Sequence, residues 1–474
     1  MVAVVTARSI RMSEASLGRF GDKRLESVGG ALLAAMQGKR TLCVHRLAKD
    51  RNQTIQFGRF LANPAVTAQE MLANAGRLAS QRAGGRHVLA IMDTTDVRFA
   101  THEASKCGFG RDANDTCPGL FLHAVLAVEA ATGGVIGLVD CAVLNRTEGK
   151  GTDHKKRAAE DKESHRWLHG AEIAADRLTE AETITMVADR ESDIYDLFAR
   201  RPANVHLLCR SAQPRAMTSG ELLPDHCTGL PEQGRETISV PPKGKQKARQ
   251  ATVALRFDAI SLRCPAGARL ITAGGGAQPK TVALWVVDVR EVDPPEGAEP
   301  LHWRLLTTHA VTTLAEARQV VAWYRMRWII EQVFRSLKSH CLRIEDSQME
   351  EAGCFIKLAV VALIAAVRAM QLVLARDGTT GQPLTDAVDP AALPALRQIN
   401  TSLEGRTKKL KNPHDPGQLA WFAWIVARLG GWSGYTSSGY KPPGPKTMHH
   451  GFIRLDQILL GWQLANRSAD LRLR

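Results

Sequence analysis

The sequence predicts an α/β protein with helical regions at both ends of the chain, and three observations support this. Short apolar runs that end in polar clusters recur between residues 86 and 210, separated by helical patterns. Residues 216–308 combine Gly- and Pro-rich turns with stretches of alternating polarity, which are typical of β-strands. Before residue 85 and after residue 340, apolar residues recur at helical spacing.

The composition limits the class of protein. The chain has 474 residues, of which 44% are hydrophobic and 23% charged, as in a folded protein with more than one domain. Its net charge of +14 favours a polyanionic partner, either nucleic acid or an anionic membrane. The most apolar run, Leu358–Val367, is too short to span a bilayer, so we expect a buried helix and no membrane partner. Nine scattered cysteines without a CxxC pair favour reduced thiols in a cytosolic protein.

The N-terminal region is strongly basic. Residues 1–68 carry 11 Lys or Arg against 4 Asp or Glu, an excess that is half of the net charge. We expect one helix that ends near Gly38, one over residues 53–61, and a third that Thr67 caps, with Glu70 three residues on. Small basic helical domains bind duplex DNA, although a basic face turned to solvent gives the same composition.

Two apolar strands are expected to end in carboxylates. His87–Met92 runs into Asp93-Thr94-Thr95-Asp96, and Thr183–Ala188 runs into Asp189-Arg190-Glu191-Ser192-Asp193. Side chains at strand ends of an α/β sheet converge on a site. The other expected elements are strands over 121–131, 135–144 and 205–210, a polar loop over 145–162, a helix over 163–178, and an inserted β subdomain over 216–308 with a basic loop at 243–249.

Residues 323–340 read as one helix with two faces. Five polar side chains fall within 80° of one another and extend along about 21 Å of helix; they are Tyr324, Arg327, Glu331, Arg335 and Lys338. The residues expected to face a core are Trp323, Met326, Ile329, Ile330, Val333, Phe334 and Leu337. One carboxylate among three cations and a phenol suits a phosphate backbone beside a metal ligand, whereas an ordinary surface helix would carry mixed charge pairs.

Asp93, Asp189 and Glu331 are the candidate catalytic carboxylates and metal ligands. Two or three carboxylates can hold a pair of Mg²⁺ ions that activate a water or hydroxyl and stabilise the leaving oxygen of a phosphodiester. A single Asp at a strand end is more often a turn residue or a helix cap. The alternatives that spacing leaves open are Asp96, Glu191 and Asp193.

Helices dominate the C-terminal region. Residues 376–394 resemble a linker, residues 421–429 are apolar, residues 430–445 form a loop, and a last helix is expected over 453–464. Trp421, Trp424, Trp432 and Trp462 belong either to the core, which is the usual place for such residues, or to a partner surface.

These motifs together resemble the DDE transposases of the insertion-sequence-four family. Tyr324, Arg327, Glu331 and Lys338 match that family's Tyr-x2-Arg-x3-Glu-x6-Lys motif at every spacing. Asp93-Thr94-Thr95 and Asp189-Arg190-Glu191 match its two Asp motifs. Further matching blocks are Lys162-Glu163-Ser164 with Trp167, Leu301-x-Trp303 with Leu305-Leu306-Thr307, Gly21-Asp22, and Arg59-Phe60 with Asn63-Pro64.

The resemblance implies a ribonuclease H-like catalytic core over residues 69–374, an end-recognition domain over 1–68 and a dimerisation domain over 375–474. It implies Mg²⁺, with Mn²⁺ as a possible substitute, at Asp93, Asp189 and Glu331, and a bacterial cytosolic homodimer that pairs two transposon ends. It further implies 3′ nicking, hairpin formation and strand transfer into target DNA. The residues expected to contact DNA are Tyr324, Arg327, Arg335, Lys338, Trp303, Arg210, Lys23, Arg24, Lys39, Arg40 and Arg59. The rival interpretations are a regulator that binds transposon ends without cutting and a plain nuclease.

Overall fold

A computed structural model describes residues 16–100, 105–147, 164–240, 248–265, 279–434 and 441–472. The chain forms two compact units, each discontinuous in the sequence. The strand-rich unit contains residues 85–93 and 151–330, and the helical unit contains residues 1–84, 94–150 and 331–474. The units cut across the three sequence ranges expected above, so the roles of those ranges stay predictions. Most of the expected loops at 145–162 and 243–249 lies outside the described residues.

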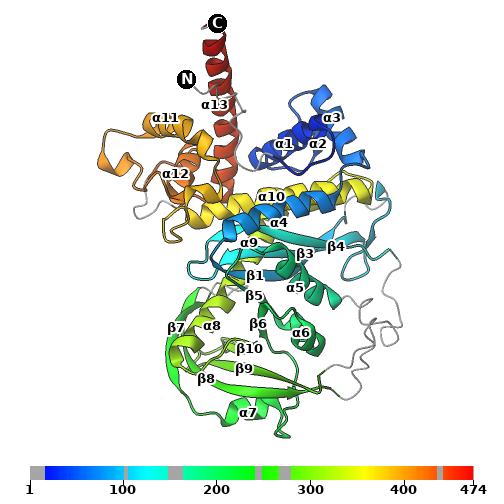
Figure 1. Ribbon diagram of the computed structural model, residues 1–474, viewed down its shortest axis with the longest axis vertical. Coiled ribbons are helices and arrows are strands. Elements are labelled where there is room, and N and C mark those ends of the chain that lie inside the picture. The colour runs from blue at the N-terminus through cyan, green and yellow to red at the C-terminus, as the bar shows by residue number, and fades with distance from the viewer. Residues whose placement is uncertain are drawn as a thin grey trace, which may run out of the picture. The chain divides into compact units, whose positions relative to one another are not determined.

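One sheet forms the core of the strand-rich unit, in the order β1-β5-β6-β10-β9-β8-β7 (Figure 1). β1 (His87–Arg98), β5 (Thr183–Ala188) and β6 (Val205–Arg210) are parallel, and β10 (His302–Thr307) is antiparallel to β6. β9 (Thr281–Glu291), β8 (Arg249–Arg263) and β7 (Gly234–Val240) continue the sheet as antiparallel strands. The strands expected within residues 216–308 are therefore present, and they continue the sheet that contains β1.

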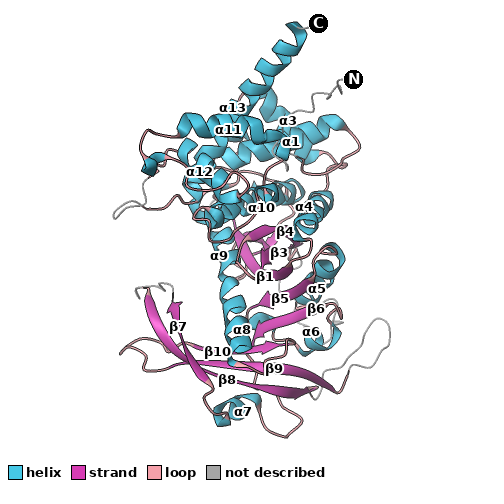
Figure 2. Ribbon diagram, turned by 60° about the vertical axis from the view of Figure 1, so that its left-hand side comes forward, coloured by secondary structure: helices cyan, strands magenta, loops and turns pink. Residues whose placement is uncertain are grey.

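Helices cover this sheet. α5 (His165–Arg177) and α8 (Leu314–Met326) both pack on β5 and β6, and Figure 2 shows them on opposite sides of the sheet. A 3₁₀ turn over Arg190–Ser192 leads to α6 (Tyr195–Arg200), and α7 (Leu223–Gly229) precedes β7. α8 begins at a capping box in which Thr313 and Glu316 bond to each other's backbone N–H groups. The predicted strand over 205–210 is confirmed, and so is the helix predicted over 163–178, which runs from His165 to Arg177.

The helical unit contains the three remaining strands of the sheet. β3 (Pro118–Glu129) and β4 (Val135–Leu144) form a hairpin, and β2 (Gly110–Arg111) pairs with β3. The hairpin turn contains Gly133 at a φ of 75°, which favours glycine because it has no Cβ. α4 (Ala68–Ala83) and α10 (Ala352–Ala375) pack on β4.

α10 is the central helix of this unit. It also contacts α1 (Lys23–Gly38), α12 (Leu419–Leu429) and α13 (Pro445–Arg472), which explains why it is apolar on all sides. Among the described helices it alone is long and apolar enough to cross a membrane, and 94% of its most apolar stretch is buried inside the protein. The prediction of a buried helix around Leu358–Val367 is therefore confirmed.

Side-chain caps begin two of the N-terminal helices, and the cap predicted at Thr67 is confirmed. Asp22 accepts a hydrogen bond from the N–H of Arg24 at the start of α1, and Thr67 accepts one from the N–H of Glu70 at the start of α4. The carboxylate of Glu70 accepts a hydrogen bond from the N–H of Arg19 at 2.7 Å. The short α2 (Val44–Leu47) and α3 (Arg51–Ala62) lie between them in the chain.

The C-terminal part of the unit contains α11 (Leu393–Leu403), α12 and α13. Trp421 and Trp424 on α12 are only 2% and 4% exposed, so they belong to the core. The expectation of a linker at 376–394 is wrong. This segment forms 3₁₀ turns over Leu384–Asp386 and Pro390–Ala392, and the buried Gln382 donates a hydrogen bond to the carbonyl of Val135 at 2.9 Å.

Two predicted elements around the candidate site have different bounds. β1 continues past Asp93 to Arg98, so Asp93 lies inside a strand and not at its end. The single helix expected over 323–340 is broken at Arg327 into α8 and α9 (Trp328–Arg335), and residues Ser336–His340 form a π-helical turn. The expected apolar face holds, because Ile330, Val333 and Leu337 are almost fully buried.

Candidate active site

Asp93 and Asp189 come from neighbouring parallel strands of the strand-rich unit. β1 and β5 pair in a register that places Ile91 opposite Val187. Because side chains alternate along a strand, the residues two positions later, Asp93 and Asp189, project from the same face of the sheet. Their side chains are 24% and 29% exposed, so both carboxylates are partly desolvated and still accessible.

The guanidinium of Arg327 bridges the two carboxylates. Its Nη1 lies 3.0 Å from Oδ2 of Asp93, and its Nη2 lies 3.8 Å from Oδ2 of Asp189. The hydroxyl of Tyr324 donates a hydrogen bond to Oδ1 of Asp189 at 3.0 Å. Two carboxylates therefore converge on one cation, and a phenol fixes the orientation of the second carboxylate.

The break between α8 and α9 places Arg327 there. Arg327 follows the last residue of α8 and is itself only 9% exposed. Its N–H bonds to the carbonyl of Tyr324 at 3.1 Å, three residues back, which tightens the chain into a turn. Neither Tyr324 nor Arg327 therefore lies on an exposed polar face, as the single-helix interpretation required; both are buried against the carboxylates.

These contacts shift the pKa values of the group. Burial opposes ionisation of Asp189, but the positive charge of Arg327, the N–H of Arg190 and the Tyr324 hydroxyl together hold its pKa below the ordinary value. Burial, reinforced by the negative charge of Asp189, raises the pKa of Tyr324, so this phenol stays protonated and keeps donating its hydrogen bond.

Trp303 and Arg210 border the same group. The indole of Trp303 on β10 is half-buried and meets the Tyr324 ring edge-on, with ring centroids 5.3 Å apart. Arg210, at the end of β6, lowers the pKa of Asp189 by its charge and donates a hydrogen bond to the carbonyl of His302 at 3.0 Å. The structure thus brings five sequence-predicted residues together, namely Asp93, Asp189, Tyr324, Arg327 and, through Tyr324, Trp303.

Glu331, Arg335 and Lys338 belong to the helical unit, because the chain passes from one unit to the other within α9, between Ile330 and Glu331. The ammonium of Lys338 lies 3.0 Å from a carboxylate oxygen of Glu345 and donates to the carbonyl of Asp96. Sequence reasoning missed Glu345, which lies seven residues beyond the matched motif.

Two of the alternative carboxylates, Asp193 and Glu191, form ion pairs away from Asp93 and Arg327. Asp193 is fully buried, accepts hydrogen bonds from the N–H groups of Ala212 and Gln213, and pairs with Arg215 at 2.8 Å, which is a structural role. Glu191 is 66% exposed and pairs with Arg166. This geometry favours Asp189 over both neighbours.

The third alternative, Asp96, lies in β1 within the helical unit. One of its carboxylate oxygens accepts from the N–H of Ala113 and lies 3.6 Å from the Arg98 guanidinium. Burial raises its pKa above the ordinary value despite these contacts.

The remaining predicted DNA contacts differ in exposure. The exposed ones are Lys23, Arg24, Arg40, Arg59 and Arg335. Lys39 instead donates its three ammonium hydrogens to the carbonyls of Arg46, Leu47 and Ala48, at 3.0, 2.9 and 3.0 Å, so it closes the end of α2.

A half-buried histidine cluster lies on the sheet of the strand-rich unit and was missed by sequence reasoning. The hydroxyl of Thr185 bonds to Nε2 of His87 at 2.8 Å and to Nε2 of His309 at 2.7 Å. His206 stacks on His309 with ring centroids 4.0 Å apart. Alternation along β1, β5 and β6 places these groups on the face that carries Asp93 and Asp189. The alternation of side chains along these strands was the sequence signal that could have identified the cluster.

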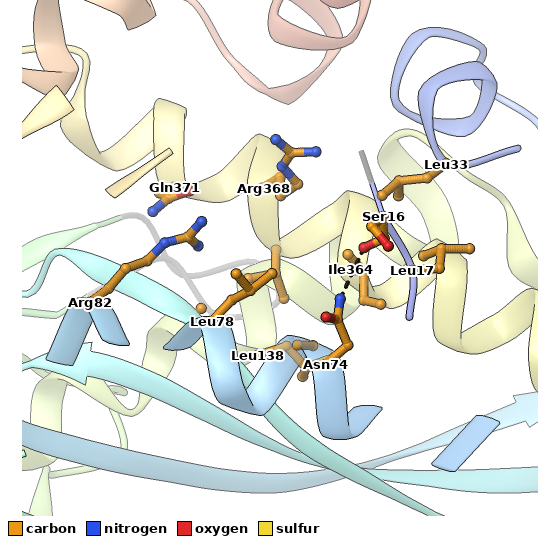
Figure 3. Close-up of a pocket in the computed structure, with 13 residues that line it drawn as sticks. Ser16, Leu17, Leu33, Asn74, Leu78, Arg82, Leu138, Ile364, Arg368 and Gln371 are labelled. Atoms are coloured by element: carbon orange, nitrogen blue, oxygen red, sulfur yellow. Dashed lines mark hydrogen bonds between the residues drawn. The ribbon is translucent and has the colours of Figure 1, made fainter. Parts of the chain in front are cut away.

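A small cavity of about 30 Å³ lies in the helical unit between α4 and α10 (Figure 3). Its walls include Leu78, Leu138 and Ile364, and the side chains of Arg82, Arg368 and Gln371 point into the same space. This volume holds roughly two water molecules. The residues that line it include none of the candidate carboxylates.

The donor set tests whether a divalent metal would fit. Mg²⁺ prefers carboxylate oxygens, and two such oxygens, from Asp93 and Asp189, already converge on a cation, the Arg327 guanidinium. The two carboxylates stabilise positive charge at the position of this guanidinium. The pair Asp93 and Asp189 therefore fits a metal ion. Within the described ranges, no three His, Cys, Asp or Glu side chains are gathered closely enough to hold a metal. The ligand set Asp93, Asp189 and Glu331 therefore stays a prediction.

Paired carboxylates on adjacent parallel strands of a mixed sheet can support metal-dependent phosphoryl transfer. The family model described as "Transposase DDE domain" matches residues 84–366, which is more than half of the chain. The chain therefore belongs to the transposase DDE domain family. Transposases of this family act on DNA and use divalent metal ions, generally Mg²⁺.

Proposed function

We propose that this transposase moves DNA by a cut-and-paste mechanism like that of the insertion-sequence-four family, with Asp93, Asp189 and Glu331 as its catalytic carboxylates. The observation that supports this most is the convergence of Asp93 and Asp189 on the Arg327 cation. Glu331 follows Arg327 by four residues, about one helical turn along α9.

The three carboxylates would hold Mg²⁺, or Mn²⁺ in its place. A metal pair supplies activation of the attacking water or 3′ hydroxyl and stabilisation of the leaving oxygen. The chain's own residues orient the DNA. Arg327 and Tyr324 lie against the carboxylates and can hold the phosphate that reacts, and Arg335 and Lys338 can hold neighbouring phosphates.

Trp303 would receive a base during hairpin formation. Closing a hairpin at a DNA end bends one strand sharply, and a base near the bend must leave the stack at a cost of a few kcal/mol. An aromatic side chain returns roughly 1–3 kcal/mol when a base stacks on it. The half-buried indole of Trp303, beside Tyr324, supports this role better than a place in the core.

Residues 1–68 would recognise transposon ends, and the C-terminal region would pair two protomers into a homodimer. The exposed basic residues of α1 and α3 support the first role. The second is supported by α13, where Ile458 and Leu460 are 40% and 59% exposed. Trp421 and Trp424 do not support it, because they are buried.

The test uses a labelled DNA duplex that carries the ends flanking the encoding gene. We expect Asp93→Asn, Asp189→Asn and Glu331→Gln each to retain DNA binding and to lose nicking in Mg²⁺ and Mn²⁺ by at least about a hundredfold. The matched control is Glu191→Gln, which changes a neighbouring exposed carboxylate and should cut normally. Normal nicking by Asp189→Asn would contradict the assignment.

The two rival functions are separated by the same assay. A regulator that only occupies the ends would bind the duplex and give no cleavage in the wild type. A plain nuclease would nick but would not join a pre-cut 3′ end to a target plasmid.

A further inference from the structure

The contact between Arg327 and the two aspartates has a consequence for metal binding. A metal ion held by both Asp93 and Asp189 would lie between their carboxylates, and Arg327 already occupies that space, with Nη1 3.0 Å from Oδ2 of Asp93. Its second nitrogen lies 3.8 Å from Asp189. A divalent ion and a guanidinium cannot both occupy the space between the same carboxylates, because like charges repel strongly at such distances.

We propose that Arg327 is a placeholder cation that must leave the two aspartates before metal binds, and that a DNA phosphate draws it away. This inference rests on the proposed function, since it assigns a regulatory step to the same carboxylates. Arg327 is then a positioning residue with two alternative partners, the aspartates in the free protein and a phosphate in the complex.

The location of Arg327 suits such an exchange. It lies in the break between α8 and α9, where the backbone leaves regular helix, and its long side chain can change partner without moving either helix. Tyr324 holds Asp189 from the other oxygen, so that carboxylate keeps its orientation when Arg327 leaves. Arginine binds phosphate and carboxylate through the same planar guanidinium N–H groups, so the phosphate and the aspartates compete for the guanidinium of Arg327.

The exchange couples DNA binding to metal binding. A DNA phosphate that takes the guanidinium leaves two partly desolvated carboxylates without their cation, which raises their affinity for a metal ion. By linkage, bound metal must raise the affinity for DNA by the same factor. The free protein would therefore bind metal weakly, because the metal is bound tightly only when a DNA phosphate holds the Arg327 guanidinium.

Isothermal titration of the DNA-free, full-length protein with Mn²⁺ tests the placeholder. We expect Arg327→Gln to bind Mn²⁺ on the order of tenfold more tightly than the wild type, within the usual range of coupling energies. Arg327→Lys, which keeps the charge, should remain close to the wild type. The matched control is Arg210→Gln, which removes a charge near Asp189 without opening the space between the aspartates, and we expect a smaller change. Thermal unfolding checks that each variant is folded.

A second measurement follows the reciprocal effect. The affinity for a fluorescent duplex of random sequence is measured by anisotropy with and without Mn²⁺ at fixed ionic strength. Mn²⁺ should tighten duplex binding by the wild type, and the gain should be largely lost in Arg327→Gln and in Asp93→Asn.

The outcomes separate this inference from the proposed function. If Mn²⁺ binding depends on Asp93 but Arg327→Gln binds no more tightly than the wild type, the placeholder is wrong and the metal site stands. If neither the wild type nor any variant binds Mn²⁺, with or without duplex, the metal site itself is wrong and both proposals fail.

Discussion

Trp303 is the residue whose role the structure makes most testable. Its indole meets Tyr324 edge-on and remains half-exposed, so it can stack on a base without leaving its strand. We expect Trp303→Ala to fold and to nick the 3′ strand, but to accumulate nicked ends and to lose most hairpin product, because the extruded base then lacks its roughly 1–3 kcal/mol of stacking.

The matched control for Trp303 is Trp285, a second half-buried indole on the neighbouring strand β9. Trp285→Ala should change thermal stability without a specific loss of hairpins. A normal hairpin yield from folded Trp303→Ala would rule out stacking.

His309 makes the stability of the strand-rich unit depend on pH. Burial, together with the charges of His206 and His87, lowers its pKa from 6.5 to about 3. The unfolded chain therefore binds a proton at His309 below about pH 6.5, whereas the folded protein does so only near pH 3. Since the unfolded state binds more protons in this window, the free energy of unfolding falls as the pH falls, by a few kcal/mol at most.

Urea unfolding at pH 7 and at pH 5 measures this effect. His309→Gln keeps a polar group near the Thr185 hydroxyl but cannot be protonated, so it should lose less stability on acidification than the wild type. An equal loss in both proteins would assign the pH dependence to other groups, such as His449, whose pKa burial lowers to about 4.

At the scale of elements, α1 and α3 carry the basic charge expected to recognise DNA ends. Lys23, Arg24 and Arg59 are exposed on them, whereas truncation of residues 1–68 would uncover α10, because α1 and α3 pack on it. Charge removal is therefore the cleaner test. The triple change of Lys23, Arg24 and Arg59 to Gln should weaken binding to the end sequence. It should also reduce the slope of log binding constant against log salt concentration by up to about 3.

Lys408 and Lys409 provide the control for this element, since they are exposed basic residues in the C-terminal part of the chain. Their change to Gln should leave the preference for end sequence over random duplex intact. If the triple variant keeps the wild-type preference for end sequence over random duplex, α1 and α3 do not recognise the end sequence.

α13 is the element expected to pair two protomers. Ile458 and Leu460 are exposed on it, while Leu455 and Leu459 are buried against the helical unit. We expect the double change of Ile458 and Leu460 to Ser to leave folding intact and to give single-end complexes with no paired-end complex in gel shift. The control is Ile55→Ser, which removes an equally exposed Ile from α3. Paired ends formed by the α13 variant would assign pairing to another surface.

For the whole molecule, local patterns predicted most elements and long-range contacts decided the rest. The cap at Thr67 and the strands β5 and β6 were predictable, because caps and apolar runs act within a few residues. The break at Arg327 was not, because periodicity alone extends a helix through any polar residue and cannot show that Asp93, 234 residues away in the sequence, binds the guanidinium.

The same limit explains the division of the chain. Sequence ranges suggested three successive domains, but α10 and α13 pack with α1 in one unit that draws on three separate segments. Contacts of this kind leave no local composition signal. The candidate carboxylates Asp93 and Asp189 were predictable because each follows an apolar run, whereas the hydrogen bond from Tyr324 to Asp189 required the fold.

The π-helical turn over Ser336–His340 has a consequence for how this gene tolerates insertions and deletions. A π turn contains one residue more than an α turn, so the loss of a single residue there would convert it to regular helix and rotate Lys338 away from Glu345 and the Asp96 carbonyl. A codon lost from this turn should therefore be as damaging as a change of Lys338 itself, whereas a substitution of the exposed Ser339 should be tolerated. A transposition assay that compares a one-residue deletion within the turn with Lys338→Ala and with Ser339→Ala would measure this.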